Sequence, residues 1–229
     1  MTAYAGYFLL ALGWIAFAVL HSMLISVAVT NAAQKWLGRH FRFYRLFYNA
    51  VALTTITPLL WYTARTAEPA FFIWDGPLLW LKWLIQLSGV LLFAAALRHY
   101  SFLHLLGARQ ILAVDRPIAA IPGGGIVSTG ILGLIRHPFY SGALLLIWAQ
   151  DLDGVHLMVN IILTVYVIIG TRLEERKLIL EFGDEYIVYR RQVSMFFPWR
   201  WIMGKLPRLS NLPQWHARSA EENRASDHL

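Results

Sequence analysis

Apolar residues are concentrated in five segments that predict membrane-spanning helices. A helix needs about 20 mainly apolar residues to cross a bilayer, and most of these runs approach or exceed that length. The pattern predicts an all-α fold, a polytopic membrane helical bundle with about five transmembrane helices and a cytoplasmic C-terminal helical cap. The five segments cover residues 4–29, 44–63, 78–97, 126–148 and 157–171.

Charged residues in the connections predict the orientation of these helices. The first and third connections are rich in Lys and Arg, as is the chain after Thr171, whereas the fourth holds Asp151 and Asp153 and no base. The second holds one arginine beside two acids. Basic residues accumulate on the cytoplasmic side of a membrane. We therefore expect the N-terminus outside and the C-terminus in the cytoplasm, in a bacterial inner membrane.

The fourth apolar segment does not resemble an uninterrupted span. Pro138 suits the first position of a helix, where its missing N–H would be unpaired anyway. A helix from Pro138 to Gln150 is about 20 Å long, short of a hydrocarbon core of about 30 Å. Irregular backbone at membrane depth must be buried in protein or line a cavity. A cavity is therefore predicted at the N-terminus of this helix, whether the segment spans or re-enters.

The fifth helix is predicted to continue beyond the membrane to Phe182 and to end at Gly183, a residue type common at helix ends. A further helix follows, in which Tyr186, Tyr189 and Val193 form an apolar stripe. This stripe either packs back on the bundle or lies on the membrane. We expect one transmembrane domain over residues 1–206 and a disordered tail over residues 207–229.

The composition agrees with a membrane protein and excludes several kinds of chemistry. Hydrophobic residues make up 58% of the chain and charged residues only 14%, against about a quarter in soluble domains. The absence of cysteine excludes disulfides, thiol nucleophiles and Cys-ligated zinc. The net charge of +7 is explained by cytoplasmic basic residues that meet anionic lipid, so no nucleic-acid partner is predicted.

The run Arg136-His137-Pro138-Phe139-Tyr140 is the first candidate for chemistry. A helix N-terminus presents unpaired N–H groups and a partial positive charge, which suits a carboxylate or a phosphate. Arg136 and His137 strengthen such a site. The alternative is that Arg136 anchors the helix at the membrane and His137 caps it.

The second candidate is the run Arg172-Leu173-Glu174-Glu175-Arg176-Lys177. Adjacent glutamates on a helix point about 100° apart, so that one can face a cavity while the other meets solvent. The alternative is a solvated helix with ion pairs at i, i+3.

Histidines outside these two runs give little evidence of a functional site by themselves. The spacing of His99 and His104 does not place two ligands on one helical face, so no metal site is predicted. His21, inside the first segment, suggests an interhelical hydrogen bond and is kept as a minor site candidate, because ionisable groups within a membrane are costly. The chain contains no phosphate-binding loop, dinucleotide fingerprint, zincin motif or nucleophile elbow.

Two stretches resemble a known superfamily. The heptapeptide that begins at Arg136 and ends at Gly142 resembles the RHPxYxG signature of the isoprenylcysteine carboxyl methyltransferase and phospholipid methyltransferase superfamily. The stretch from Glu174 to Pro198 resembles the EExxLxxxFGxxYxxYxxxVxxxxP pattern of the same group. The N-terminal part is faintly similar to bacterial methanethiol S-methyltransferases.

This resemblance implies S-adenosylmethionine as the cofactor, held between the last membrane hairpin and the C-terminal helices. By resemblance, residues for the amino-acid end of the cofactor are His137, Pro138 and Tyr140. The adenine would lie against Phe182, Tyr186 and Tyr189. The ribose, the amino group or the acceptor would meet Glu174 or Glu175. Candidates for binding an anionic acceptor group are Arg136, Arg172 and Arg109, so the catalytic candidates are Glu174, Glu175, Arg136 and Arg172.

Two other functions fit the pattern. A membrane reductase of the sterol-reductase type would place reduced nicotinamide cofactor in a similar C-terminal architecture. A non-enzymatic membrane subunit would keep the bundle with a degraded pocket. The methyl acceptor stays open among a small thiol, a prenylated cysteine carboxylate and a lipid amine.

Overall fold

The computed structural model describes residues 3–98, 106–108, 111 and 126–204. The residues His99, His104 and Arg109 considered above and the tail at 207–229 lie outside them. Within these residues the regular secondary structure is helical, with two isolated β-bridges in the connections, which confirms the all-α prediction. The α-helices are α1 (Ala3–Ile25), α2 (Val27–Leu37), α3 (Tyr44–Arg65), α4 (Pro77–Leu97), α7 (Pro138–Trp148), α8 (Gly154–Phe182), α9 (Asp184–Gln192) and α10 (Trp199–Ile202), and the 3-10 helices are η1 (Gly38–Phe43) and η2 (Gly130–Gly133).

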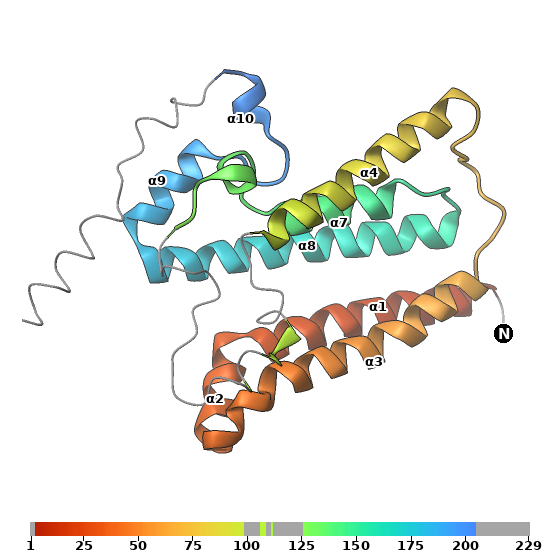
Figure 1. Cartoon of the computed structure of the whole chain (residues 1–229). Coiled ribbons are helices and arrows are strands. Elements are labelled where there is room, and N and C mark those ends of the chain that lie inside the picture. The colour runs from red at the N-terminus through yellow and green to blue at the C-terminus, as the bar shows by residue number, and fades with distance from the viewer. Residues whose placement is uncertain (1–2, 99–105, 109–110, 112–125, 205–229) are drawn as a thin grey trace, which may run out of the picture.

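The long helices form a bundle with a helical cap at one end (Figure 1). Helices α1 and α3 run side by side, and α1 also packs on α8. Helix α4 packs along α7, and α7 folds back onto α8 through a short connection. Helices α9 and α10 lie at the C-terminal end of α8. The predicted C-terminal cap is therefore present.

Three helices of the described chain are long and apolar enough to cross a membrane, namely α1, α4 and α8. The protein is thus an integral membrane protein, as predicted. The other two predicted spans are also helices, but each is less typical of a span. Helix α3 has the length, yet threonines, Asn49 and Pro58 interrupt its apolar sequence. Helix α7 has 11 residues and begins at Pro138, which confirms the short, proline-started helix.

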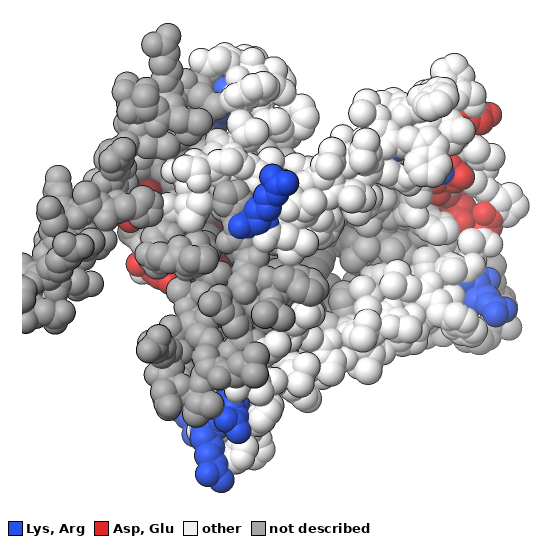
Figure 2. Space-filling model, viewed as in Figure 1, with Lys and Arg blue, Asp and Glu red and all other residues white. Residues whose placement is uncertain are grey.

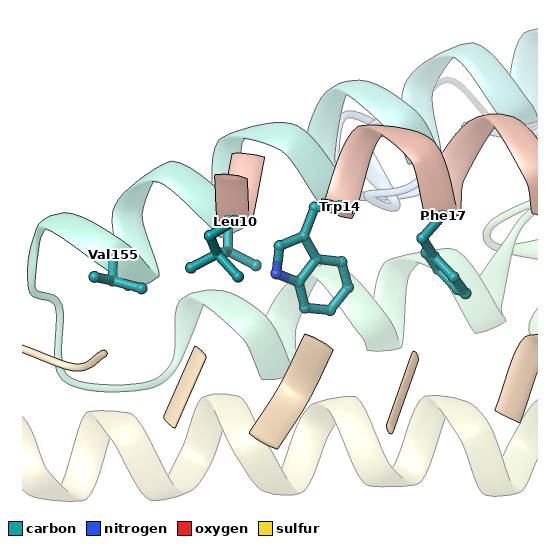
Figure 3. Packing of buried hydrophobic residues seen from close by; sticks show 5 residues of the cluster. Leu10, Trp14, Phe17 and Val155 are labelled. Carbon is teal, nitrogen blue, oxygen red and sulfur yellow. The ribbon is translucent and has the colours of Figure 1, made fainter. Parts of the chain in front are cut away.

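The buried core joins α1, α3 and α8. Leu10, Trp14 and Phe17 on α1 meet Val155 and Val159 on α8 (Figure 3). The indole N–H of Trp14 donates to the hydroxyl of Thr63 on α3 at 3.1 Å. An N–H group in an apolar interior needs such a partner. This contact therefore fixes α1 against α3.

Acidic side chains gather at the end of the bundle opposite the cap (Figure 2). The two acids of the fourth connection, Asp151 and Asp153, hold the α7–α8 connection in place. Asp151 accepts a 2.9 Å hydrogen bond from the ammonium of Lys82. Hydrogen bonds from Lys82 and the Trp74 backbone lower the pKa of the Asp151 carboxyl below its usual value. Asp153 caps α8 by accepting from the backbone of His156 at 2.7 Å and binds the backbone N–H of Glu68 at 2.9 Å. Both acids therefore join the α7–α8 connection to helix α4 and to the connection between α3 and α4.

Helix α8 extends far beyond its apolar part, as predicted. It ends at Phe182, and Gly183 follows with a φ of 56°, which L-residues with side chains rarely adopt. Asp184 and Glu185 then occupy the first turn of α9, where negative charge is favourable. The glycine turns the chain so that α9 folds back towards α8.

A close crossing of α4 and α7 depends on two glycines. A Cβ atom on Gly142 would lie 2.8 Å from the carbonyl oxygen of Gly89 and 2.9 Å from the ring of Phe93. A Cβ atom on Gly89 would in turn lie 3.1 Å from the carbonyl oxygen of Gly142. Small residues let helix backbones approach closely within a membrane. The glycine of the RHPxYxG pattern therefore serves helix packing.

We expect Gly142→Ala to destabilise the protein by about 1–3 kcal/mol, because the added methyl group meets backbone that cannot give way. Thermal unfolding in detergent measures the effect. Gly170→Ala on α8 is the matched control, since a Cβ atom there has nothing within 4 Å. Equal melting temperatures for the Gly142→Ala protein and the wild type would contradict the packing role.

Candidate functional site

The segment that leads into α7 pairs with the segment that follows α9. The backbone N–H of Arg136 donates to Ser194 at 2.8 Å, and that of His137 donates to Met195 at 3.2 Å. Ile135 and Ser194 form a parallel bridge. This pairing places the Arg136 and His137 side chains between α8 and α9.

Arg136 is held in a buried ion pair. Its guanidinium nitrogens lie 2.7 and 2.8 Å from Oε1 of Glu175. The side chains of Arg136 and Glu175 are only 7% and 6% exposed. Nη1 of the same guanidinium also donates to the carbonyl oxygens of Arg190, at 2.9 Å, and of Val193. Arg136 therefore joins the start of α7 to α8 and to the end of α9.

His137 lies between the two glutamates. Its Nε2 is 3.2 Å from Oε1 of Glu175, and its Nδ1 is 3.9 Å from Oε2 of Glu174. The ring stacks on Tyr140 with a centroid separation of 5.7 Å. Three predicted site residues from two helices therefore converge on one buried imidazole.

The two adjacent glutamates, about 100° apart around α8, have different surroundings. Glu175 is buried and satisfied by Arg136 and His137. The side chain of Glu174 is 45% exposed overall, and its carboxylate lies close enough to the hydroxyl of Tyr140 to act on it electrostatically. Its Oε2 atom is nevertheless buried, and the described residues offer it no hydrogen-bond partner. Glu174 is thus the glutamate with spare acceptor capacity.

A small hollow adjoins Glu174, and we call it the glutamate hollow. Its volume is about 60 Å³. Its walls are Ile126, Val127, Leu132, Arg136, His137, Glu174, Leu178, Phe182, Tyr186 and Tyr189. Five of the seven predicted cofactor residues are among them. The other two do not line the hollow: Tyr140 stacks on His137, which does, and Pro138 is the buried first residue of α7.

The aromatic wall is formed by α9, whose stripe packs back on the bundle. Tyr186, Tyr189 and Val193 form a buried cluster with Leu178 and Phe182 on α8. The hydroxyl of Tyr189 donates to the carbonyl oxygen of Leu132 at 2.7 Å. Burial, reinforced by the negative charge of Glu175, raises the pKa of the Tyr186 hydroxyl, so it stays protonated at neutral pH. Of the two alternatives for the stripe, packing on the bundle is the one observed.

Arg172 lies apart from the glutamate hollow. It lines an open cleft of about 760 Å³ on the other side of the Arg136–Glu175 pair. We call this the arginine cleft, after its residues Arg136, Arg172, Arg176, Arg190 and Arg200. Among the described residues no cluster of His, Cys, Asp or Glu has the form of a metal site.

His21 makes the interhelical hydrogen bond that its place in α1 suggested. Its Nε2 bonds the hydroxyl of Tyr48 on α3, and its ring lies 6.2 Å from that of Tyr166 on α8. Sequence reasoning missed Tyr48 and Tyr166, although aromatic hydroxyls within apolar segments are a usable signal. It also missed Ser141, whose hydroxyl donates to the carbonyl of Phe196 at 2.8 Å and so holds α7 to the C-terminal segment.

Comparison with known proteins agrees with the superfamily resemblance. A family model described as NnrU protein matches residues 9–173. That match covers most of the chain, so the chain belongs to the NnrU protein family. It ends immediately before Glu174, so the two glutamates and α9 lie beyond it.

Curated relatives bear the name methanethiol S-methyltransferase. The protein from Pseudomonas deceptionensis is 37% identical over 123 residues, which cover 53% of this chain and 44% of the relative. The protein from Mycobacterium tuberculosis is 31% identical over 162 residues, which cover 65% of this chain and 62% of the relative. The chain therefore spans less than two thirds of these relatives. The predicted kinship with membrane methyltransferases is confirmed, and no solved structure matches significantly.

We expect Arg136→Gln to cost about 3–5 kcal/mol of stability, because it leaves the Glu175 carboxylate buried without its partner. Arg172→Gln, at an exposed position, should change stability by no more than about 0.5 kcal/mol. Thermal unfolding in detergent compares the two. The double variant Arg136→Gln/Glu175→Gln should lose less than the sum of the single variants. A stability loss in the double variant equal to the sum of the two single losses would show that Arg136 and Glu175 do not stabilise each other.

Proposed function

We propose that this member of the NnrU family is an integral membrane methyltransferase that uses S-adenosylmethionine and methylates a small thiol. The observation that carries the proposal is the unpartnered, buried oxygen of Glu174 beside His137 and Tyr140. It faces a hollow with tyrosine walls. The resemblance to methyltransferase motifs falls on the same residues.

The charges near Glu174 suit a cationic ligand. A buried acceptor without a partner costs about 1–3 kcal/mol, and a ligand ammonium or sulfonium group beside it would offset that cost. Aromatic faces such as those of Tyr186 and Tyr189 also attract cations. The arginine cleft would repel a sulfonium group. The glutamate hollow is therefore the better site for S-adenosylmethionine.

The size of the hollow requires movement on binding. It measures about 60 Å³, whereas small-molecule sites hold about 300–1,000 Å³. Helix α9 provides the tyrosine wall and is connected to α8 through Gly183. We propose that this wall moves outward when the cofactor enters.

The residues around the hollow can then serve methyl transfer. The bound cofactor supplies an electrophilic methyl group. Glu174 would hold the positive end of the ligand, Tyr140 would support the ring of His137 on which it stacks, and His137 would accept the proton of the thiol. A thiol with a pKa of about 8.5 is mostly protonated at neutral pH, so a nearby base increases the reactive thiolate. Alignment of donor and acceptor in a site that excludes water supplies much of the acceleration.

The name of these relatives, methanethiol S-methyltransferase, favours a small thiol as acceptor. Such a molecule is apolar enough to reach an active site from the bilayer. The orientation that places the cap in the cytoplasm of a bacterial inner membrane would expose the site to soluble cofactor. A prenylated cysteine carboxylate and a lipid amine are the acceptors to test against it.

Calorimetry on the purified protein tests the cofactor site. We expect S-adenosylmethionine to bind and Glu174→Gln to weaken its affinity by about tenfold or more, because the substitution removes a charge-assisted contact. Glu181→Gln, at an exposed position on the same helix, is the matched control. Equal affinity in the wild type and Glu174→Gln would refute the site assignment. Binding of NADPH in place of S-adenosylmethionine would favour a membrane reductase, and binding of neither a non-enzymatic subunit.

An acceptor panel tests the substrate class. Proteoliposomes with methyl-labelled S-adenosylmethionine are offered methanethiol, a prenylated cysteine or phosphatidylethanolamine, and labelled product is counted. We expect label in the methanethiol product and little in the other two. Preferential labelling of the lipid amine or of the prenylcysteine ester would replace the thiol with that acceptor.

A further inference from the structure

The arginine cleft has no role in the proposed methyl transfer. It lies where α8 meets the end of α9 and the segment around α10 (Figure 1). The buried Arg136–Glu175 pair lies between the cleft and the glutamate hollow, since Arg136 lines both spaces and Glu175 lines the cleft. A methanethiol acceptor has no anionic group that needs a cluster of arginines.

The charges lining this cleft are strongly unbalanced. Among the described residues that line it, five are arginines and one is an acid, Glu175. That carboxylate is already paired with Arg136 at 2.7 Å and lies 4.0 Å from Arg190. Within the described part of the chain, the side chains of Arg172, Arg176 and Arg200 form no ion pair. The cleft therefore carries an excess of positive charge that an anion would neutralise.

The rim of the cleft is aromatic and exposed. Phe197 and Trp199 line the cleft and are 61% and 57% exposed. Trp201 and Ile202 on α10 are exposed beside them. Aromatic side chains at this density on a membrane protein are typical of the bilayer–water interface. The cleft thus combines a phosphate-type anion site with an apolar border.

We propose that the arginine cleft binds the phosphate group of an anionic phospholipid. Guanidinium groups match phosphate oxygens in bidentate geometry. The aromatic rim would contact the glycerol and the upper acyl chain, which a soluble phosphate lacks. Bound lipid would hold the cap against the membrane surface beside the glutamate hollow.

Titration of the purified full-length protein in detergent tests this proposal. Short-chain phosphatidylglycerol is compared with phosphatidylcholine of the same chain length, and binding is read by native mass spectrometry. We expect phosphatidylglycerol to bind about tenfold or more tightly than phosphatidylcholine. The double variant Arg176→Gln/Arg200→Gln should lose that preference, because cationic side chains near anionic lipid each add to the affinity.

The control variant is Arg42→Gln/Arg191→Gln, which removes the same charge outside the cleft. We expect it to keep the phosphatidylglycerol preference within about twofold. An equal loss in both double variants would contradict a localised site. Should the Gln variant unfold, Arg176→Lys/Arg200→Lys keeps the charge and should retain a preference for phosphatidylglycerol, and a complete loss there would also count against the proposal.

Competition separates a lipid from a soluble anion. Inorganic phosphate and glycerol phosphate, at the concentration of the lipid, should leave phosphatidylglycerol bound. Displacement by either would show that a free phosphate is the natural ligand. Displacement by NADPH would point to a nucleotide instead, and both results would overturn the lipid assignment.

Discussion

The guanidinium group of Arg136 joins three parts of the chain at one point. It pairs with Glu175 on α8 and donates to backbone carbonyls at the end of α9, while its own backbone pairs with the segment that follows α9. Because both charged side chains are almost fully buried, removing either would leave a costly unpaired charge. The glutamate hollow on one side and the arginine cleft on the other depend on this contact, because it keeps α9 folded back on α8.

The same contact explains why two adjacent glutamates are useful. The Glu175 carboxylate pairs with Arg136 and His137 and stabilises the fold. Glu174, one residue earlier and about 100° round the helix, keeps a buried oxygen without a partner. His137 and Tyr140 are fixed beside it by the proline-started helix α7. A structural ion pair thus prepares a second carboxylate for ligand binding.

Local features of the fold were predictable, and long-range ones were not. The start of α7 at Pro138 and the end of α8 before Gly183 follow from residues that act on their own backbone. The sequence predicted that Arg136 binds an anion, but it did not reveal the backbone groups that Arg136 contacts. The carbonyls of Arg190 and Val193 are more than fifty positions away along the chain. Which of the two glutamates faces inward depends on how α8 is rotated about its axis. The packing of α8 against α1 fixes that rotation. The arginine cleft escaped prediction because it combines Arg136, which precedes α7, with residues of α8, α9, α10 and the segment between α9 and α10.

An experimental structure determined with S-adenosylmethionine bound tests the central claim most directly. We expect the charged end of the cofactor to lie against Glu174 and His137, with α9 displaced outward and the Arg136–Glu175 pair intact. A cofactor bound in the arginine cleft, or an Arg136 that leaves Glu175 to contact the ligand, would contradict it.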